Sequence, residues 1–372
     1  MLIIIKSHIL RRIYILLLLS LIDFPVLFSQ NTDFIIDTKI QYGTILPHRI
    51  FMRHLLTGHA TYAMISLSKP LYGNKPWEQI YNYPAKGIAF HYLNLGNPEQ
   101  LGNVYGIFPY ISFPCIRSEN YTFGYRWGAG AGFLEKPFDR KDNYKNNAIG
   151  TKINFLMSVM LESKWRINNN FALTADLGIT HLSNGDFKQP NLGINVATFG
   201  LGASYNIIQR QPAVFLKDTL PAPDKGLTYT FIAAFGLKET IPADTSNYLV
   251  YTIYSNFTKP AGKRRRLGLG LDIFYDASNI ALYNSDTNNT VSDKKTEFIK
   301  PGIHFSHELV IGKLQVVTEM GVYIYDKYKK DGNIYHRVAM RHYIYKKLLF
   351  NFSIKSHWIN ADYIEWGLGY RF

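Results

Sequence analysis

The 372-residue chain has a single cysteine, Cys115. One cysteine excludes an intrachain disulfide framework and any cysteine-rich metal site. Acidic residues are also in the minority, because 27 Asp and Glu stand against 41 Lys and Arg and give a formal net charge of +14. This balance favours an anionic partner, either nucleic acid or a phosphate-bearing membrane surface, although a basic surface that serves solubility gives the same count.

Long hydrophobic runs are missing after residue 30, where no segment approaches the ~18–20 apolar residues of a membrane-spanning helix. At the start of the chain, basic residues precede an apolar run over 13–22 and a small-residue cleavage site at Ser29-Gln30. This order is typical of a secretory signal peptide, the alternative being a retained membrane anchor. We predict a signal peptide over 1–30 and an exported chain over 31–372, either soluble or embedded without helices.

Motifs for nucleotide, metal and nucleic-acid binding are also missing. The "GAGAG" stretch at 128–132 lacks the Lys-Ser/Thr of a phosphate-binding loop. His48, His54 and His59 lie close together but do not complete a set of metal ligands, so we interpret them as rim or lumen histidines. The basic surplus forms no nucleic-acid motif. We expect no metal, no cofactor and no nucleic-acid partner.

Alternation of apolar and polar residues with a period of two is abundant. It covers the segments 121–133, 152–166, 267–275 and 348–358. Successive side chains point to opposite faces of a strand, so each segment has one apolar and one polar face. Aromatic residues make up 15% of the chain, which suits an all-β protein or a membrane barrel with aromatic girdles.

A soluble sandwich alternates in the same way, but three features favour a membrane barrel. Many segments are ten or more residues long, near the ~9–11 that cross a bilayer and above the ~5–6 of globular strands. Aromatic residues such as Trp165, Tyr275 and Trp358 lie near the ends of apolar faces, as interface girdles require. The polar faces carry glycine and charged residues that would be costly inside a sandwich core. The terminal Phe372 resembles the last residue of outer-membrane barrels.

About sixteen candidate strands can be counted. We predict an all-β fold, a transmembrane antiparallel up-and-down β-barrel of about 14 strands, with 12 to 16 left open. The short links 167–170 and 345–347 are interpreted as periplasmic turns, and the longer links 134–150 and 277–296 as outer loops. The proline-containing link 208–226 is the best candidate for a domain boundary, the alternative being a long loop within one barrel.

The strand over 171–183 continues its apolar face into His181 and Ser183. If the 167–170 turn is periplasmic, both residues face lipid near the outer rim, and Asn195 of the returning strand shares their face. Polar groups facing lipid are costly, which indicates a function. A histidine can take the proton of a serine nucleophile near neutral pH, and a third group orients the imidazole. Backbone N–H groups or an asparagine amide can stabilise an oxyanion.

The stretch "HLSNGDFKQPNLGIN" (181–195) resembles the signature of PagL-type lipid A 3-O-deacylases and their acyloxyacyl-hydrolase-like relatives, which are outer-membrane β-barrel esterases. The resemblance covers 85–207, and 208–372 would add strands to the eight-stranded barrels common in the family. It implies that His181 is the base and Ser183 the nucleophile. Oxyanion or supporting roles fall on Asn184, Gly185 and Asn191.

One residue departs from this pattern, because the family's glutamate falls on Asn195. Asparagine can orient a histidine without supplying a negative charge. Asp186 and Glu162 are the alternative acids, although the alternation directs Glu162 into the lumen.

The resemblance implies a serine esterase of the bacterial outer membrane that removes an ester-linked acyl chain from lipid A of lipopolysaccharide through an acyl-enzyme. Two rival interpretations stay open: a channel or transporter, and a non-catalytic lipid-binding or structural barrel. The sequence also leaves open which acyl position is cut and whether the barrel forms a homodimer.

Overall fold

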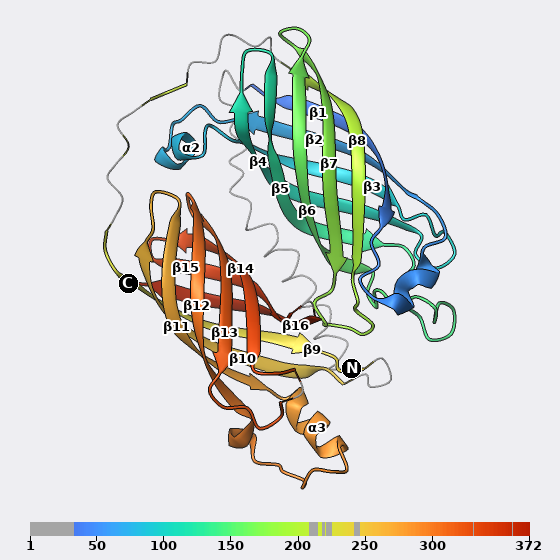
Figure 1. The fold of residues 1–372 in the computed structure, drawn as a ribbon, viewed down its shortest axis with the longest axis vertical. Helices are drawn as coiled ribbons and strands as arrows, with labels where there is room; N and C mark the ends of the chain where they lie inside the picture. Colours follow the sequence, from blue (N-terminus) through green and yellow to red (C-terminus); the bar gives the residue numbers. More distant parts are fainter. Residues whose placement is uncertain are drawn as a thin grey trace.

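The computed structural model describes residues 33–207, 215–217, 220, 225–241, 246–329, 331–358 and 360–372. The predicted signal peptide and most of the 208–226 link lie outside the described residues. In the described parts, antiparallel strands form two closed barrels of eight strands each, which lie beside one another (Figure 1).

The strands of the first barrel follow one another in chain order: β1 (Ile35–Ile45), β2 (Ala60–Pro70), β3 (Ala85–Asn94), β4 (Asn103–Arg117), β5 (Tyr121–Leu134), β6 (Ile153–Arg166), β7 (Phe171–Ser183) and β8 (Ile194–Asn206). The second barrel repeats this arrangement with β9 (Thr228–Lys238), β10 (Tyr248–Pro260), β11 (Arg265–Asp276), β12 (Ile299–Ile311), β13 (Leu314–Tyr323), β14 (Ile334–Tyr345), β15 (Leu348–His357) and β16 (Asn360–Arg371). Short helices lie in the connections: η1 (Ile50–Leu55), α2 (Pro76–Ile80), α3 (Ser278–Ser285) and η2 (Lys295–Phe298). Among the described residues, no helix is long and apolar enough to cross a membrane.

The prediction of an antiparallel all-β barrel is confirmed, and the total of 16 strands lies at the upper end of the predicted range, but these strands form two barrels of eight rather than one. The physical reason is strand pairing. The whole of β1 pairs with β8, and β16 pairs with β9, so each set of eight closes on itself. In the sequence, the 208–226 link separates the two sets.

Each barrel has two unlike ends. The end at which β7 and β15 finish carries longer connections, such as 135–152 and 277–298, and is called the long-loop end. The opposite end, with the 167–170 and 346–347 links, is called the short-turn end; the 71–84 connection that contains α2 is a longer exception there. Which end faces the periplasm stays a prediction.

The barrel walls are apolar outside and polar inside, the reverse of a soluble protein. Large hydrophobic side chains are exposed around both barrels: Ile40, Ile65, Phe90, Ile107, Val159, Leu177 and Phe199 on the first, and Phe235, Ile253, Leu269, Ile303, Phe305, Val338 and Leu368 on the second. Alternate positions of the same strands point inward and carry buried polar residues. This distribution suits a wall that faces lipid.

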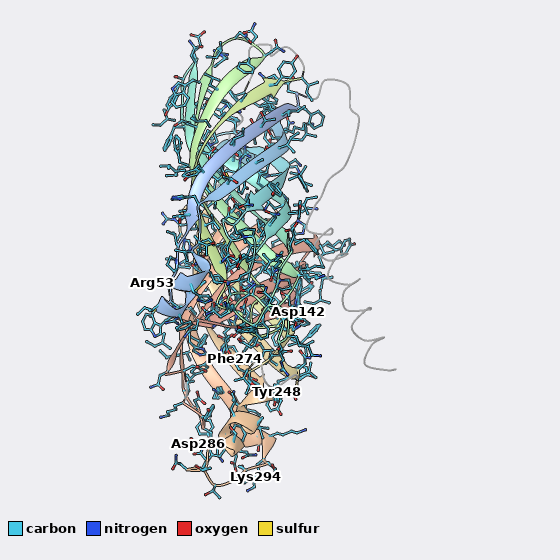
Figure 2. All side chains as sticks on the ribbon, turned by 90° about the vertical axis from the view of Figure 1, so that its right-hand side faces the viewer. Arg53, Asp142, Tyr248, Phe274, Asp286 and Lys294 are labelled. Carbon is cyan, nitrogen blue, oxygen red and sulfur yellow. The ribbon has the colours of Figure 1, made fainter. Side chains whose placement is uncertain are left out.

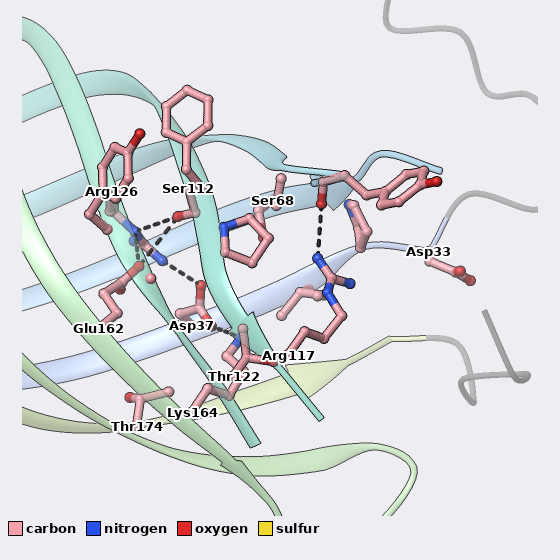
Figure 3. Close-up of a pocket in the computed structure, with 18 of the residues that line it drawn as sticks. Asp33, Asp37, Ser68, Ser112, Arg117, Thr122, Arg126, Glu162, Lys164 and Thr174 are labelled. Atoms are coloured by element: carbon pink, nitrogen blue, oxygen red, sulfur yellow. Dashed lines mark hydrogen bonds and ion pairs between the residues drawn. The ribbon is translucent and has the colours of Figure 1, made fainter. Parts of the chain in front are cut away.

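The interior of the first barrel has two parts: a buried hydrophobic cluster that includes Leu93, Phe108 and Leu156, and a cluster of charged side chains toward the short-turn end. Arg126 pairs with Asp37 and with Glu162 at 3.0 Å each, and Lys39 pairs with Asp176 at 3.1 Å. Figure 3 shows the Arg126 pairs beside a pocket at the short-turn end. An eight-stranded barrel is just wide enough for side chains to fill it. The pocket lies at the opposite end of the barrel from the predicted site.

The second barrel is filled by a similar network. Arg337 contacts three carboxylates, those of Asp272 at 3.0 Å, Glu319 at 2.7 Å and Glu365 at 3.0 Å. Arg341 shares Glu319 at 2.7 Å. Pairing offsets part of the cost of burying these charges.

Side-chain contacts join the two barrels at the short-turn end of the first barrel. After α2, the Tyr81 hydroxyl donates to the Val310 carbonyl at 2.9 Å. Arg264 donates to the Ile80 carbonyl, and its guanidinium lies 5.0 Å from the centre of the Tyr81 ring. The barrels are offset along their length (Figures 1 and 2). The long loops of the first barrel therefore lie beside the wall of the second barrel.

Candidate functional site

The β7–β8 strand pair places two of the predicted site residues opposite each other. His181 and Asn195 are direct cross-strand partners, and Ser183 pairs with Phe155 of β6. His181 and Ser183 lie two residues apart on the outward face of β7, at the long-loop end. The sequence interpretation of an outward-facing pair at this end therefore agrees with the fold.

The hydrogen bond between His181 and Asn195 sets the imidazole tautomer. The Nδ1 atom of His181 lies 2.7 Å from Oδ1 of Asn195. An amide oxygen can only accept, so Nδ1 carries the proton and donates it to this bond. The Nε2 atom of His181 is then the unprotonated one, as a general base requires.

The Ser183 hydroxyl is held by the loop that follows β7. Its Oγ accepts from the Gly185 N–H at 3.0 Å and from Nδ2 of Asn191 at 3.0 Å. The Oδ1 atom of Asn191 accepts from the Asn184 N–H at 2.9 Å. Among the described residues, the hydroxyl is bound by these loop groups and not by His181. Catalytic hydrogen bonds are often long or misaligned until substrate binds.

A glycine separates the base from the nucleophile. Gly193 has a φ of +76°, and a Cβ added there would lie 3.0 Å from Cε1 of His181 and 3.7 Å from Cβ of Ser183. Any side chain at this position would crowd the imidazole and would contact Ser183. The missing Cβ therefore leaves the space beside the imidazole open.

The remaining predicted residues support the loop. The side chain of Asn184 donates to the Lys188 carbonyl at 2.7 Å, so this amide is engaged within the loop. Asp186 accepts from Nδ2 of Asn191 at 3.1 Å rather than from His181. Burial raises the pKa of Asp186 to about 7. Glu162, the other alternative acid, points into the lumen and pairs with Arg126.

The second barrel covers Ser183, so the prediction that this side chain faces lipid is corrected; no local pattern in the sequence indicates this cover. Ser183 is only 5% exposed, and the ring of its neighbour Phe155 lies 5.3 Å from the ring of Phe352 on β15. After β9, the Glu239 N–H donates to the Asp186 carbonyl at 3.0 Å, and the Glu239 carboxylate accepts from the N–H of Gln189 at 2.9 Å. These contacts join residues at least 50 positions apart, and no local pattern marks them.

Two closed antiparallel barrels with apolar outer walls and interiors that hold many buried polar side chains define a transmembrane β-barrel protein of the bacterial outer-membrane class. Residues 61–204 match the family model "Lipid A 3-O-deacylase (PagL)", and residues 227–372 match "Acyloxyacyl hydrolase, C-terminal domain". Together the matches cover the second barrel and most of the first, with β1 outside them, and the chain belongs to the PagL-type family of outer-membrane barrels. The second match accounts for the strands after residue 208.

Solved structures show weaker likenesses. Neisserial surface protein A shares 9% identity with a TM-score of 0.33, covering 48% of this chain and all of that one. The outer membrane protein Omp33 of Acinetobacter baumannii shares 8% identity with a TM-score of 0.18, covering 92% of this chain and 99% of that one. No curated protein matches the chain.

Proposed function

We propose that this protein is a serine esterase that removes an ester-linked acyl chain from lipid A of lipopolysaccharide. The observation that carries the proposal is the hydrogen bond between His181 and Asn195 beside Ser183. It gives an outward-facing histidine the tautomer of a general base, two residues from a hydroxyl nucleophile. The family match supports lipid A as the substrate, because its description names a lipid A 3-O-deacylase.

The residues suggest a two-step reaction. Ser183 leaves its loop partners, Nε2 of His181 takes the hydroxyl proton, and Oγ attacks the ester carbonyl carbon. The ester bond breaks, and His181 returns the proton to the departing lipid A hydroxyl. The acyl-enzyme then reacts with water, which His181 deprotonates, and the fatty acid is released. The Gly185 N–H and the Asn191 amide, which hold Oγ in the resting state, are the donors nearest to the developing oxyanion.

The surroundings of the site suit a phosphorylated lipid. Exposed basic residues lie in the long loops of the first barrel: Arg53, Lys136, Arg140, Lys141, Lys145 and Lys188. Cationic side chains at a membrane surface attract anionic head groups by about 1 kcal/mol each. The apolar wall below the loops suits acyl chains, so the ester of a bound lipid would lie between the loops and this wall.

Mass spectrometry of lipid A tests the proposal. Lipid A is extracted from cells that express the wild type, Ser183→Ala, His181→Ala or the control Ser163→Ala, whose serine bonds to Tyr121 at the other end of the barrel. The wild type and the control should remove one acyl chain, and the two site variants should remove none. Identical spectra from all four would refute the esterase and leave a lipid-binding or structural barrel.

A further inference from the structure

A third side chain, that of a second histidine, adjoins the base and its orienting residue. His48 follows β1, where the Leu46 N–H donates to the Asn195 carbonyl at 2.8 Å and holds this stretch of chain against β8. The Nδ1 atom of His48 lies 3.3 Å from Nδ2 of Asn195. Asn195 therefore contacts one histidine through its amide oxygen and another through its amide nitrogen.

The partners of His48 fix which end of the Asn195 amide faces which ring. A contact with the Leu192 backbone raises the pKa of His48, the effect of a carbonyl that accepts from a ring N–H, so one ring nitrogen is a donor. In a neutral imidazole the other nitrogen is an acceptor, and it can only receive the N–H of the Asn195 amide. Burial and the neighbouring Arg49 charge hold the pKa of His48 below its ordinary value, which keeps the ring neutral. The amide oxygen is then directed at His181.

This orientation matters because an amide has two unlike ends. A carboxylate presents an acceptor to a histidine in either rotamer, whereas a flipped asparagine would present N–H to Nδ1 of His181 and place the proton on Nε2. Replacing the orienting aspartate of a serine-protease triad with asparagine costs ~10⁴-fold in kcat, since the histidine takes the wrong tautomer. Asn195 can therefore orient His181 only if a neighbouring residue prevents the amide from flipping.

We propose that His48 is a positioning residue, which fixes the Asn195 amide so that its oxygen accepts from Nδ1 of His181. The inference deepens the proposed esterase and rests on it. His48 is a neutral group in the connection between β1 and β2, and it is 147 positions from Asn195 in the sequence. The charge that an acidic residue would supply is thus replaced by a chain of three hydrogen-bonded side chains.

A double-mutant cycle tests this role. His48→Ala should lower kcat for lipid A deacylation by ~10–100-fold with little change in KM, the usual cost of losing a group that orients another. In an Asn195→Asp background, the carboxylate needs no orienting partner, and the same change should cost less than about threefold. His48→Gln keeps an acceptor and should retain part of the activity. His59→Ala is the matched control, because His59 is exposed and its ring lies 5.0 Å from the Tyr42 ring, centroid to centroid.

A second measurement does not depend on turnover. In ¹⁵N-histidine-labelled protein in micelles, the nitrogen shifts of His181 should report a proton on Nδ1 in the wild type and in His59→Ala, and a shift toward Nε2–H in His48→Ala. An unaltered His181 pattern in folded His48→Ala would overturn the inference, as would equal losses of kcat in both backgrounds. A wild type without deacylase activity would refute the esterase alone, since the tautomer measurement would still decide the role of His48.

Discussion

Gly185 of the first barrel packs directly against Ile364 of β16 in the second. Its φ is +62°, and a Cβ built on it would overlap the Ile364 side chain. The same residue donates its N–H to Oγ of Ser183. The conformation of the nucleophile loop is therefore coupled to the way the second barrel sits against the first.

Gly185→Ala should lower both stability and activity. A left-handed φ disfavours alanine, and a side chain forced into a packed contact costs ~1–3 kcal/mol. We expect a lower thermal midpoint in micelles and at least a ~10-fold loss of deacylation. Gly262→Ala is the matched control, because its φ is +87° and nothing lies within 4 Å of the added Cβ. Adding Ile364→Ala should restore part of the loss; no restoration would show that the backbone alone is responsible.

Glu239→Ala should slow deacylation without unfolding either barrel. It removes the carboxylate that accepts from the Gln189 N–H, so the loop that holds Ser183 gains freedom. We expect a loss of ~10-fold in kcat/KM, as for other supporting groups, and an unchanged thermal midpoint. Glu297→Ala serves as the control, since Glu297 pairs with Lys327 in the long loops of the second barrel. Equal activity of the two variants would contradict a supporting role for Glu239.

Local patterns predicted the strands and the outward site, but not the number of barrels. Alternation in 121–133 or 348–358 is the same whether strands close in one ring or two, because it reports the two faces of a strand and not its distant partners. Closure depends on pairs such as Ile35 with Asn206, which lie far apart in the sequence. The link at 208–226 was the single local sign of a division.

Local sequence patterns likewise predicted some residues of the candidate site and not others. His181, Ser183 and Asn195 share a face by alternation, so a sequence reader can group them. His48 joins Asn195 through the ring closure of β1 with β8, and Ile364 reaches the loop through the packing of two barrels. Neither contact has a local periodicity, so both require the three-dimensional structure.

Neither barrel should conduct ions. Interiors filled by paired charges such as Arg126 with Asp37 leave no continuous aqueous path in a ring of eight strands. Planar-bilayer recordings of the purified protein should show no steps above baseline, in contrast to a porin measured in the same chamber. Reproducible channels that persist in Ser183→Ala would favour the transporter interpretation.

Arg337→Met should destabilise the second barrel strongly. It would leave three buried carboxylates without their common partner, and breaking a buried ion pair from one side costs ~3–5 kcal/mol. We expect a lower urea midpoint for unfolding from micelles. The exposed Arg265→Met is the control and should stay within about 0.5 kcal/mol of the wild type. A wild-type midpoint in Arg337→Met would show that the network contributes little.

Asp186 should make stability depend on pH. Burial raises its pKa from 3.8 to about 7, so the folded protein holds a proton that the unfolded chain has lost above about pH 4. The stabilising contribution is complete below pH 4 and disappears as the pH rises through 7. Lys238 of the second barrel lowers the pKa of Asp186, and Asp362 of the same barrel raises it. These two charges therefore do not cancel the effect of burial on this pKa.

Asp186→Asn removes this titration and should unfold at a higher urea concentration than the wild type at pH 8. A shift of three pKa units sets a ceiling of ~4 kcal/mol, and partial exposure of the side chain reduces the expected gain to ~1–2 kcal/mol. At pH 5 the gain should shrink. Asp139→Asn is the control, because backbone hydrogen bonds from Lys141 and Asp142 lower the pKa of Asp139 and no gain at pH 8 is expected. A pH-independent difference between Asp186→Asn and wild type would show that the carboxyl is ionised throughout this range.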